Sequence, residues 1–225
     1  MNLLKKSMSI QHKDIAAIRE DYCLGNLSEL DLLNDPIQQF KKWFDEAVKA
    51  SVKEPNAMTL STVNAQLQPS SRIVLLKDLK ANGFSFFTNY LSRKGKDMMT
   101  NPQVSLLFFW QELQRQVRIE GQVVQLPEED SDDYFLSRPI SSQVGAIASP
   151  QSEIIANREI LEQRVAVVNQ QLHAGVNIVR PSYWGGYLVI PHKIEFWQGR
   201  SSRLHDRLEY VLNADNTWQI HRLAP

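Results

Sequence analysis

The chain has 225 residues, of which 43% are hydrophobic, so it can bury a substantial core in one large domain or two small ones. Lys plus Arg and Asp plus Glu both number 25, and this zero net charge argues against a general nucleic-acid or membrane-surface binder. Cys23 is the single cysteine, which excludes an intramolecular disulfide and a cysteine-based zinc cluster and fits a reducing compartment.

The N-terminal segment, MNLLKKSMSIQHKD, lacks the apolar core of a signal peptide. No stretch approaches the roughly 20 apolar residues of a membrane-spanning helix. We therefore expect a cytoplasmic protein without a membrane partner. Residues 1–30 are mixed and polar apart from a short helical candidate at 14–22, so we expect a flexible N-terminal arm, followed by a single domain over residues 31–225.

A helix is predicted to begin at Asp35, which is a typical N-cap, with Pro36 in the first turn. Its apolar residues recur at helical spacing and predict one core-facing side, formed by Ile37, Phe40, Phe44, Ala47 and Val48. From Ala57 the period changes to that of strands. AMTLSTV and SRIVLLK, separated by the polar turn NAQLQP, predict a hairpin. The run Ile73–Leu76 is apolar on both faces, which predicts burial on both.

The middle of the chain predicts further strands at 84–89, 104–110 and 114–126, and a short helix at 92–101 capped by Ser92. Two more helices are predicted at 127–137 and 152–172. The C-terminal part returns to strands in YWGGYLVI, KIEFWQG, LHDRLEYVLN and TWQIHRL. Six or seven mostly antiparallel strands with helices between them predict a mainly β protein with inserted helices (α+β), built as a decorated β-barrel rather than a doubly wound sheet.

Several kinds of chemistry lack their sequence signatures. Neither GxGxxG nor GxxxxGK[ST] follows a strand, and no GxSxG nucleophile elbow is present. None of the five histidines stands at ligand spacing from another, so no metal site is expected. The adjacent carboxylates Asp132 and Asp133 are interpreted as the solvated first turn of a helix.

The unusual feature is a set of cations beside apolar strands. Arg203, His205 and Arg207 alternate in RLHDR, so on a strand they would project from one face and repel each other unless an anion or solvent relieves them. The alternative for this triplet is an exposed, hydrated strand face. Arg93 and Lys94 could hold a phosphate at a helix start or could simply be solvated. The other cations of the set are Arg72 and Lys77, at the two ends of one strand, Arg115, and Arg138, one helical turn after Tyr134.

Ten motifs, in order along the chain, resemble those of the pyridoxamine 5′-phosphate oxidases. They are RIVLLK, FFTN followed by SRK, SLLFFW, RQV, YFLSRP, SSQVGA, SPQS, FWQG, RLHDR and RLAP. The resemblance extends from the helix at Asp35 to Pro225 and is looser in the arm. It implies an FMN-binding split β-barrel that works as a homodimer, with two FMN molecules at the subunit interface. The implied reaction oxidises pyridoxamine 5′-phosphate or pyridoxine 5′-phosphate to pyridoxal 5′-phosphate, with hydride transfer from C4′ to flavin N5 and reoxidation of the flavin by O2 to H2O2.

The resemblance also implies three groups of site residues. The FMN contacts would be Arg72, Ile73, Val74, Leu75, Leu76, Lys77, Phe87, Thr88, Arg93, Lys94, Gln116, Gln151, Ser152, Trp197 and Arg207. The substrate contacts would be Arg19, Glu20, Asp21 and Tyr22 in the arm, then Lys77, Tyr134, Arg138, Ser142, Arg203, Leu204 and His205. Of these, Arg203 and His205 would be catalytic. Phe87 stands where many bacterial relatives have Tyr.

Two alternative functions remain open at this point. One is a split-barrel flavin reductase or related oxidase with another substrate, and the other is a non-catalytic carrier of FMN or pyridoxal phosphate. RLHDR and YFLSRP count against the flavin reductase, whereas a carrier would keep the same pocket and lack turnover. Because Arg72 and Lys77 are five residues apart, an unbroken strand would point them to opposite faces, toward different ligands or different parts of one.

Overall fold

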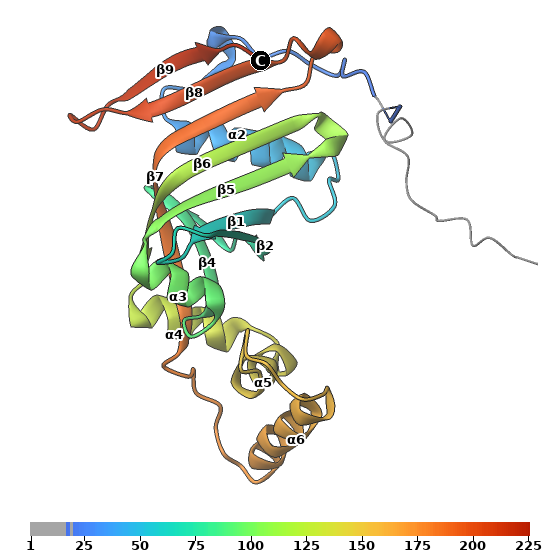
Figure 1. Ribbon diagram of the computed structural model, residues 1–225, viewed down its shortest axis with the longest axis vertical. Coiled ribbons are helices and arrows are strands. Elements are labelled where there is room, and N and C mark those ends of the chain that lie inside the picture. The colour runs from blue at the N-terminus through green and yellow to red at the C-terminus, as the bar shows by residue number, and fades with distance from the viewer. Residues whose placement is uncertain (1–16, 19) are drawn as a thin grey trace, which may run out of the picture.

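The computed structural model describes residues 17, 18 and 20–225. Its centre is a curled antiparallel sheet with strand order β2-β1-β5-β6-β7-β4-β3, extended by β8 on β7 and by β9 on β8 (Figure 1). The strands are β1 (Ala57–Val63), β2 (Pro69–Leu75), β3 (Asp78–Lys80), β4 (Gly83–Asn89), β5 (Gln103–Trp110), β6 (Arg115–Gln125), β7 (Trp184–Gln198), β8 (Asp206–Leu212) and β9 (Trp218–Leu223).

The helices lie around this sheet and confirm the prediction of a mainly β fold with inserted helices. They are η1 (Glu29–Asp31), α2 (Pro36–Lys49), α3 (Arg93–Thr100), η2 (Gln111–Leu113), α4 (Glu128–Ser137), α5 (Ile140–Ala148), α6 (Glu159–His173) and η3 (Ser201–Arg203). Figure 1 shows α2 behind the upper strands and α5 and α6 together at the opposite end of the molecule.

Helix α2 begins as predicted, because the Asp35 carboxylate accepts hydrogen bonds from the backbone N–H groups of Ile37 at 2.7 Å and Gln38 at 3.3 Å. The Phe40 ring lies 4.9 Å, between centroids, from both Phe84 on β4 and Phe108 on β5. Burying one such ring contributes about 1.5–3 kcal/mol, so α2 is held mainly by its contacts with the sheet. The prediction for Val48 is wrong, because its side chain is 53% exposed.

Strand β7 connects most of the sheet. It is one strand of 15 residues, where the sequence indicated two separated by Pro191. The strand continues because its register on β6 shifts there: Glu120 pairs with Lys193 and Gly121 with Pro191. His192 is therefore an extra residue in β7, a bulge beside the proline, which has no N–H to donate. The first part of β7 pairs with β4, and its last part pairs with β8. Residues near its two ends are therefore far apart in space.

The strand predicted at 71–77 is shorter than expected. It stops at Leu75, and the next two N–H groups bond elsewhere, Leu76 to the Asn56 carbonyl and Lys77 to the Ser85 carbonyl. The expected burial of this run on both faces is wrong, because β2 is an edge strand and Ile73 is 64% exposed. The opposite-face argument for Arg72 and Lys77 required an unbroken strand, and it no longer applies because β2 ends at Leu75.

The helical region after β6 differs most from the prediction. Helix α5 was missed, and α6 begins at Glu159 rather than at 152, which leaves Ile154 fully exposed before it. Asp132 is not a solvated first-turn residue, because α4 begins at Glu128 and the Asp132 carboxylate binds Arg180 Nε at 2.6 Å. Helices α5 and α6 pack through a small cluster of their own that contains Val144, Ala148 and Val168.

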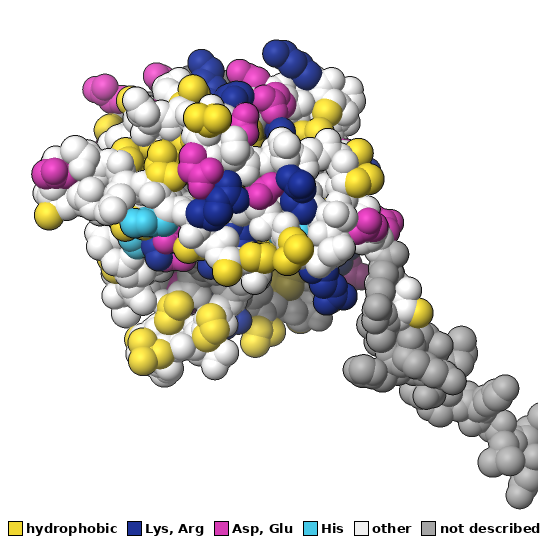
Figure 2. Space-filling model, turned by 90° about the horizontal axis from the view of Figure 1, so that it is seen from above, with side chains coloured by type: hydrophobic (Ala, Val, Ile, Leu, Met, Phe, Trp, Pro, Cys, Tyr) yellow, Lys and Arg dark blue, Asp and Glu magenta, His cyan; other side chains and the backbone are white. Residues whose placement is uncertain are grey.

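Part of the predicted helix at 14–22 lies outside the described residues, and its described residues, 17, 18 and 20–22, are not helical. The boundary at residue 30 between arm and domain stays a prediction. On the face seen in Figure 2, acidic and basic side chains are interspersed, as expected for a chain without net charge. None of the helices among the described residues is long and apolar enough to cross a membrane.

Candidate active site

The first group of candidate residues surrounds Lys94, in the first turn of α3. Its ammonium nitrogen is a hydrogen-bond donor to Thr88 Oγ1 at 2.9 Å, Ser92 Oγ at 3.0 Å and Gln151 Oε1 at 3.0 Å. The residue is only 8% exposed, and no carboxylate of the described chain lies within 4.0 Å of its nitrogen. Burial, followed by repulsion from Arg72, lowers the pKa of Lys94 to about 8. A buried cation without a counter-charge favours an anionic ligand.

Arg72 lies beside this group and is held in place by neutral oxygens. Its guanidinium donates to the Leu60 carbonyl at 3.1 Å, to Thr62 Oγ1 at 2.8 Å and to Ser70 Oγ at 2.9 Å. Burial lowers the pKa of Arg72, while the charge of Asp97 opposes that shift. The Asp97 carboxylate is connected to Arg72 through Thr62, whose hydroxyl donates to it at 2.7 Å. We call Arg72, Thr88, Lys94 and Gln151 the cation cluster.

A pocket of about 450 Å³ borders the cation cluster. Its lining includes Arg93 and Lys96 of α3 together with Gln151 and Ser152 of the loop after α5, and also the carboxylates of Asp97 and Glu153. Arg93 is exposed at the helix start, where the helix dipole also favours an anion. Cations, amide groups and a helix N-terminus at one pocket form a suitable site for a phosphate.

The predicted backbone contacts of Ile73–Leu76 fall on the edge strand β2. The only strand paired with β2 in the described chain is β1, so its other edge keeps unpaired N–H and C=O groups. Val74 and Leu75 are partly buried and Leu76 is buried, while the Ile73 side chain points to solvent. These residues can therefore offer backbone groups to a ligand, as the resemblance implies.

The second group is aromatic and lies between β4, α4 and the start of β7. Phe87 and Tyr134 stack with ring centroids 3.9 Å apart and planes 19° apart, so position 87 contributes an apolar ring. The guanidinium carbon of Arg138 lies 4.6 Å from the Trp184 ring centroid. Its Nη1 is buried without a hydrogen-bond partner among the described residues, and burial lowers the pKa of Arg138.

A pocket of about 350 Å³ is lined by Lys77, Phe87 and Tyr134 and also by three carboxylates, those of Asp78, Asp130 and Asp133, while Arg138 lies outside its lining. Ser142 is partly buried on α5, four residues after Arg138. An unpartnered buried donor costs about 1–3 kcal/mol, so Arg138 is prepared to receive an acceptor from a ligand. The structure thus places Lys77, Phe87 and Tyr134 around one pocket.

The third group surrounds the loop between β7 and β8. The Trp197 and His205 ring centroids are 4.7 Å apart, and Tyr22 of the arm packs against both, at 5.9 Å and 6.0 Å. Asp21 accepts the Ser202 N–H at 3.3 Å. Glu20 is exposed, and Arg19 lies outside the described residues.

The expectation that RLHDR forms one strand face is wrong. Arg203 belongs to η3, His205 lies in the loop after it, and β8 begins only at Asp206. Ser202 and Arg203 have positive φ angles of 57° and 61°, which an extended strand cannot contain. The chain therefore bends where the alternation predicted a straight segment, and it leaves Arg203 and Leu204 exposed.

Arg207 has its counter-charge within the chain. Its guanidinium binds both carboxylate oxygens of buried Glu195, at 2.8 Å and 3.0 Å, and this pairing raises its pKa. Its Nη1 also donates to the Ala224 carbonyl at 2.9 Å. Sequence reasoning missed Glu195, although KIEF places one carboxylate in an apolar strand, which requires a buried partner. An FMN contact by Arg207 stays a prediction.

These groups do not meet within one chain. Thr88 and Phe87 pair with Gly185 and Gly186 at the start of β7. Trp197 pairs with Arg207 and with Gln116, which is partly buried, at the other end of the strand. Gly186 and Trp197 are 11 residues apart, about 35 Å along the strand. One chain therefore holds two separate halves of the predicted site.

Two family models match this chain. The one described as pyridoxamine 5′-phosphate oxidase matches residues 44–172. The other, described as pyridoxine 5′-phosphate oxidase C-terminal dimerisation region, matches residues 184–225. Among curated proteins, the pyridoxine/pyridoxamine 5′-phosphate oxidase of Trichormus variabilis is 55% identical over 213 residues, covering 95% of this chain and 99% of its own. That of Cupriavidus pinatubonensis is 54% identical over 211 residues, covering 94% and 99%.

Two solved structures share the fold. PhzG from Burkholderia lata 383, in complex with tetrahydrophenazine-1-carboxylic acid, has a TM-score of 0.83 at 33% identity and covers 90% of this chain and 99% of its own. A pyridoxamine 5′-phosphate oxidase-related, FMN-binding protein from Nostoc punctiforme has a TM-score of 0.67 at 13% identity, covering 83% and 97%. The predicted split-barrel architecture is confirmed by these neighbours.

Proposed function

This chain belongs to the pyridoxamine 5′-phosphate oxidase family, and we propose that it oxidises pyridoxamine 5′-phosphate or pyridoxine 5′-phosphate to pyridoxal 5′-phosphate with FMN as cofactor. The observation that supports this most directly is a pair of cationic groups, the buried Lys94 side chain and the buried Nη1 of the partly buried Arg138, each without a carboxylate partner among the described residues. The proposed cofactor and substrate bring two phosphates, one for each.

The cation cluster suits the FMN phosphate. A phosphate within reach of Lys94 and Arg72 would supply the missing negative charge, and Thr88 and Gln151 keep the ammonium group oriented. Bound FMN supplies the redox chemistry, for which we propose hydride transfer from the substrate C4′ to flavin N5 and reoxidation by O2 to H2O2. The protein's own part is to hold and orient both ligands and to exclude water.

Arg138 suits the substrate phosphate. We propose that its free Nη1 and the Ser142 hydroxyl join Lys77 and Tyr134, which line the pocket next to Phe87, around one anion. The Trp184 ring behind the guanidinium fixes its orientation, so a bound phosphate meets a preformed donor.

Arg203 and His205 would complete the site from a second copy of the chain. Within one chain they lie beside Trp197, at the far end of β7 from the cation cluster. Residues 184–225 match a dimerisation region, which supports a homodimer in which this end meets the partner's cation cluster. We propose that Arg203 and His205 contact the substrate ring there.

A second candidate is oxidation of another substrate on the same fold. It is favoured by the solved PhzG structure, which holds tetrahydrophenazine-1-carboxylic acid. This alternative keeps the flavin site but not the phosphate role of Arg138. A non-catalytic carrier of FMN or pyridoxal phosphate would keep both sites without turnover.

The deciding experiment is to purify the protein, record its flavin absorbance, and add pyridoxine 5′-phosphate in air. Aldehyde and H2O2 should form in equal amounts, and unphosphorylated pyridoxine should be a much poorer substrate. A yellow protein that makes neither product would indicate a carrier or another substrate. A colourless protein that cannot be loaded with FMN would contradict every flavin-dependent function.

The role of Arg203 is tested separately. Arg203→Leu should lower kcat while the protein keeps its FMN, because the side chain is exposed in the loop and far from the cation cluster of its own chain. Lys49→Leu, an exposed position at the end of α2, is a matched control that should leave kcat unchanged. Equal turnover by the Arg203 variant and the parent would remove Arg203 from the reaction.

A further inference from the structure

The loop that presents Arg203 and His205 is conformationally strained. Ser202 and Arg203 are consecutive non-glycine residues with positive φ. Such backbone conformations are sparsely populated and persist only where the surroundings hold them. The backbone bond from the Leu204 N–H to the Ser201 carbonyl, at 3.1 Å, is too local to fix the loop relative to the sheet. Side chains from outside the turn must therefore determine its position.

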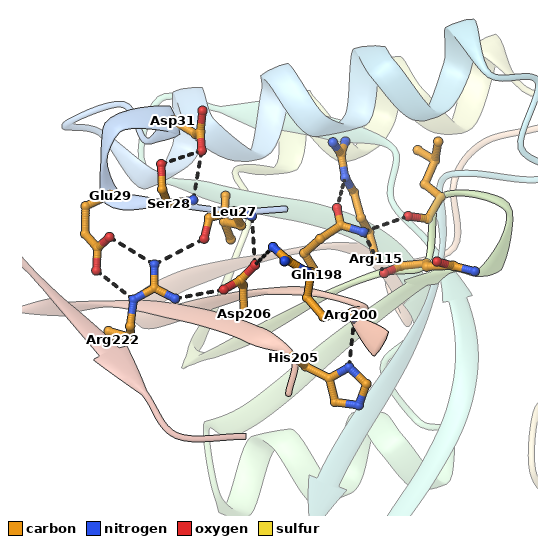
Figure 3. Close-up of polar contacts among 12 residues, drawn as sticks. Leu27, Ser28, Glu29, Asp31, Arg115, Gln198, Arg200, His205, Asp206 and Arg222 are labelled. Carbon is orange, nitrogen blue, oxygen red and sulfur yellow. Dashed lines mark hydrogen bonds and ion pairs between the residues drawn. The ribbon is translucent and has the colours of Figure 1, made fainter. Parts of the chain in front are cut away.

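An ion pair closes the loop at its base. Arg200, just before η3, places Nη1 3.1 Å from Asp206 Oδ2, at the first residue of β8 (Figure 3). The loop residues 201–205 lie between these two positions. The Arg200 backbone N–H also donates to His205 Nδ1 at 3.1 Å. Arg200 is thus joined both to the end of the loop and to the imidazole within it. We call the Arg200–Asp206 pair the loop clasp.

Asp206 is also bound from two other segments. Its Oδ2 accepts the Leu27 N–H at 3.0 Å, and its Oδ1 accepts Arg222 Nη1 of β9 at 2.9 Å (Figure 3). Arg222 in turn binds both carboxylate oxygens of Glu29, at 2.8 Å and 2.9 Å. The Asp206 side chain is 17% exposed. One carboxylate therefore connects the end of the arm, the loop and the last strand.

The backbone N–H of Arg200 also determines which nitrogen of His205 has the proton. Because a backbone N–H donates to Nδ1, that nitrogen is the acceptor, and in the neutral ring the proton is on Nε2. His205 then presents Nε2–H as a donor, on a ring that packs against Trp197 and Tyr22. If the loop shifted, the Arg200 N–H would leave Nδ1 and both tautomers would become available.

We propose that Arg200 and Asp206 are positioning residues, which hold the Arg203–His205 loop in place and fix His205 as an Nε2–H donor. The inference rests on the proposed function for its kinetic consequences but not for the loop geometry. The Arg200 side chain is 42% exposed, and an ion pair this exposed adds little to global stability. Loss of the clasp should therefore appear in turnover rather than in unfolding.

The test compares Arg200→Met and Asp206→Asn with the parent holoenzyme. Displacing reacting groups by about 1 Å can lower a rate roughly 100-fold, so we expect kcat to fall between 10- and 100-fold. KM should change less, because Lys77 and Arg138 hold the substrate phosphate elsewhere. The Tm should stay within about 2 °C for Arg200→Met. Arg200→Lys should recover part of kcat, since an ammonium group can still reach Asp206.

Two readouts do not depend on turnover. Nitrogen-15 NMR of the parent should show His205 as the Nε2–H tautomer, and Arg200→Met should show a mixture. Hydrogen exchange at residues 200–205 should become faster in the same variant. Arg158→Met, which breaks an exposed ion pair with Glu162 on α6, is the control that should change none of these quantities.

The outcomes separate the two proposals. A parent without oxidase activity would contradict the proposed function, while the NMR and exchange measurements would still test the loop. A parent that turns over, with an Arg200→Met variant of equal kcat and an unchanged Nε2–H spectrum, would overturn the inference. If Asp206→Asn folds poorly because of its further contacts, Arg200→Met alone decides.

Discussion

Lys94→Met should separate the two effects of a buried ammonium group: destabilisation of the protein without FMN and binding of the FMN phosphate. Methionine keeps most of the side-chain volume and removes the charge. The parent holds this cation with three neutral oxygens and no carboxylate of the described chain nearby. We therefore expect the variant to be more stable than the parent without FMN and to bind FMN more weakly.

The size of the stability effect follows from the lowered pKa. A change from 10.5 to about 8 corresponds to about 3 kcal/mol, at 1.36 kcal/mol per pH unit. Between these two values the unfolded chain binds a proton that the folded chain has released, so the parent's free energy of unfolding rises with pH in this window. The parent should gain about 3 kcal/mol relative to Lys94→Met between pH 7 and pH 10.5.

FMN binding should show the opposite pH dependence. A bound phosphate raises the pKa of Lys94, so binding above pH 8 requires uptake of a proton, and affinity should fall up to tenfold per pH unit. Removing the charge-assisted contact should cost about 1.5–3 kcal/mol, roughly a 10- to 150-fold rise in Kd at pH 7. Fluorescence titration of FMN from pH 6.5 to 9.5, together with thermal unfolding of the protein without FMN, measures both effects.

Lys49→Met is the control, because Lys49 is exposed at the end of α2. It should match the parent in both measurements. The reasoning is refuted if Lys94→Met binds FMN as tightly as the parent, or if its affinity keeps the same decline above pH 8. The first result would remove Lys94 from the phosphate site, and the second would assign the titration to another group.

Three further changes test the other groups. Gly199→Ala should lower kcat/KM several-fold at unchanged FMN affinity. The new Cβ would lie 2.6 Å from a Tyr22 ring carbon and would displace the ring from the loop. Steady-state rates equal to the parent's would contradict this. Arg138→Met should raise the substrate KM without lowering Tm, since the lost donor Nη1 has no internal partner; an unchanged KM would argue against it. Glu195→Gln should lower the free energy of unfolding by about 3 kcal/mol, because Arg207 loses its buried counter-charge, and urea denaturation measures it.

Most of the fold could be predicted from local patterns. The Asp35 cap, the Ser92 cap and the alternation of β6 involve residues close in sequence, and each was found where it was expected. The predictions were wrong where the structure of a segment depends on contacts with segments distant in sequence. Ile73 is exposed because β2 has one neighbour, and β7 continues past Pro191 because its register on β6 shifts at the extra residue His192. Neither fact can be read from the strand itself.

For the candidate site, too, local motifs were predictive and contacts between distant segments were not. The motifs indicated which residues to examine, and the structure places Thr88, Lys94 and Gln151 in hydrogen-bond contact and Tyr22 beside His205. The prediction that alternating residues of RLHDR share one strand face was wrong because two positive φ angles, at Ser202 and Arg203, bend the chain. Ser and Arg rarely adopt that conformation, so their residue types do not predict it. The pairing of Glu195 with Arg207 and that of Arg200 with Asp206 depend on tertiary packing, so neither could be predicted from the sequence.

The length of β7 has a consequence for mixtures of defective chains. Under the proposed homodimer, each site takes its cation cluster from one chain and its Arg203–His205 loop from the other. A hybrid of a Lys94→Met chain with an Arg203→Leu chain then contains one site with both defects and one with neither. Two preparations that are each nearly inactive should regain activity when they are unfolded and refolded together, up to a quarter of the parent's specific activity for random pairing. Because β7 separates the two halves of the site within each chain, two chains with different defects can together form one intact site.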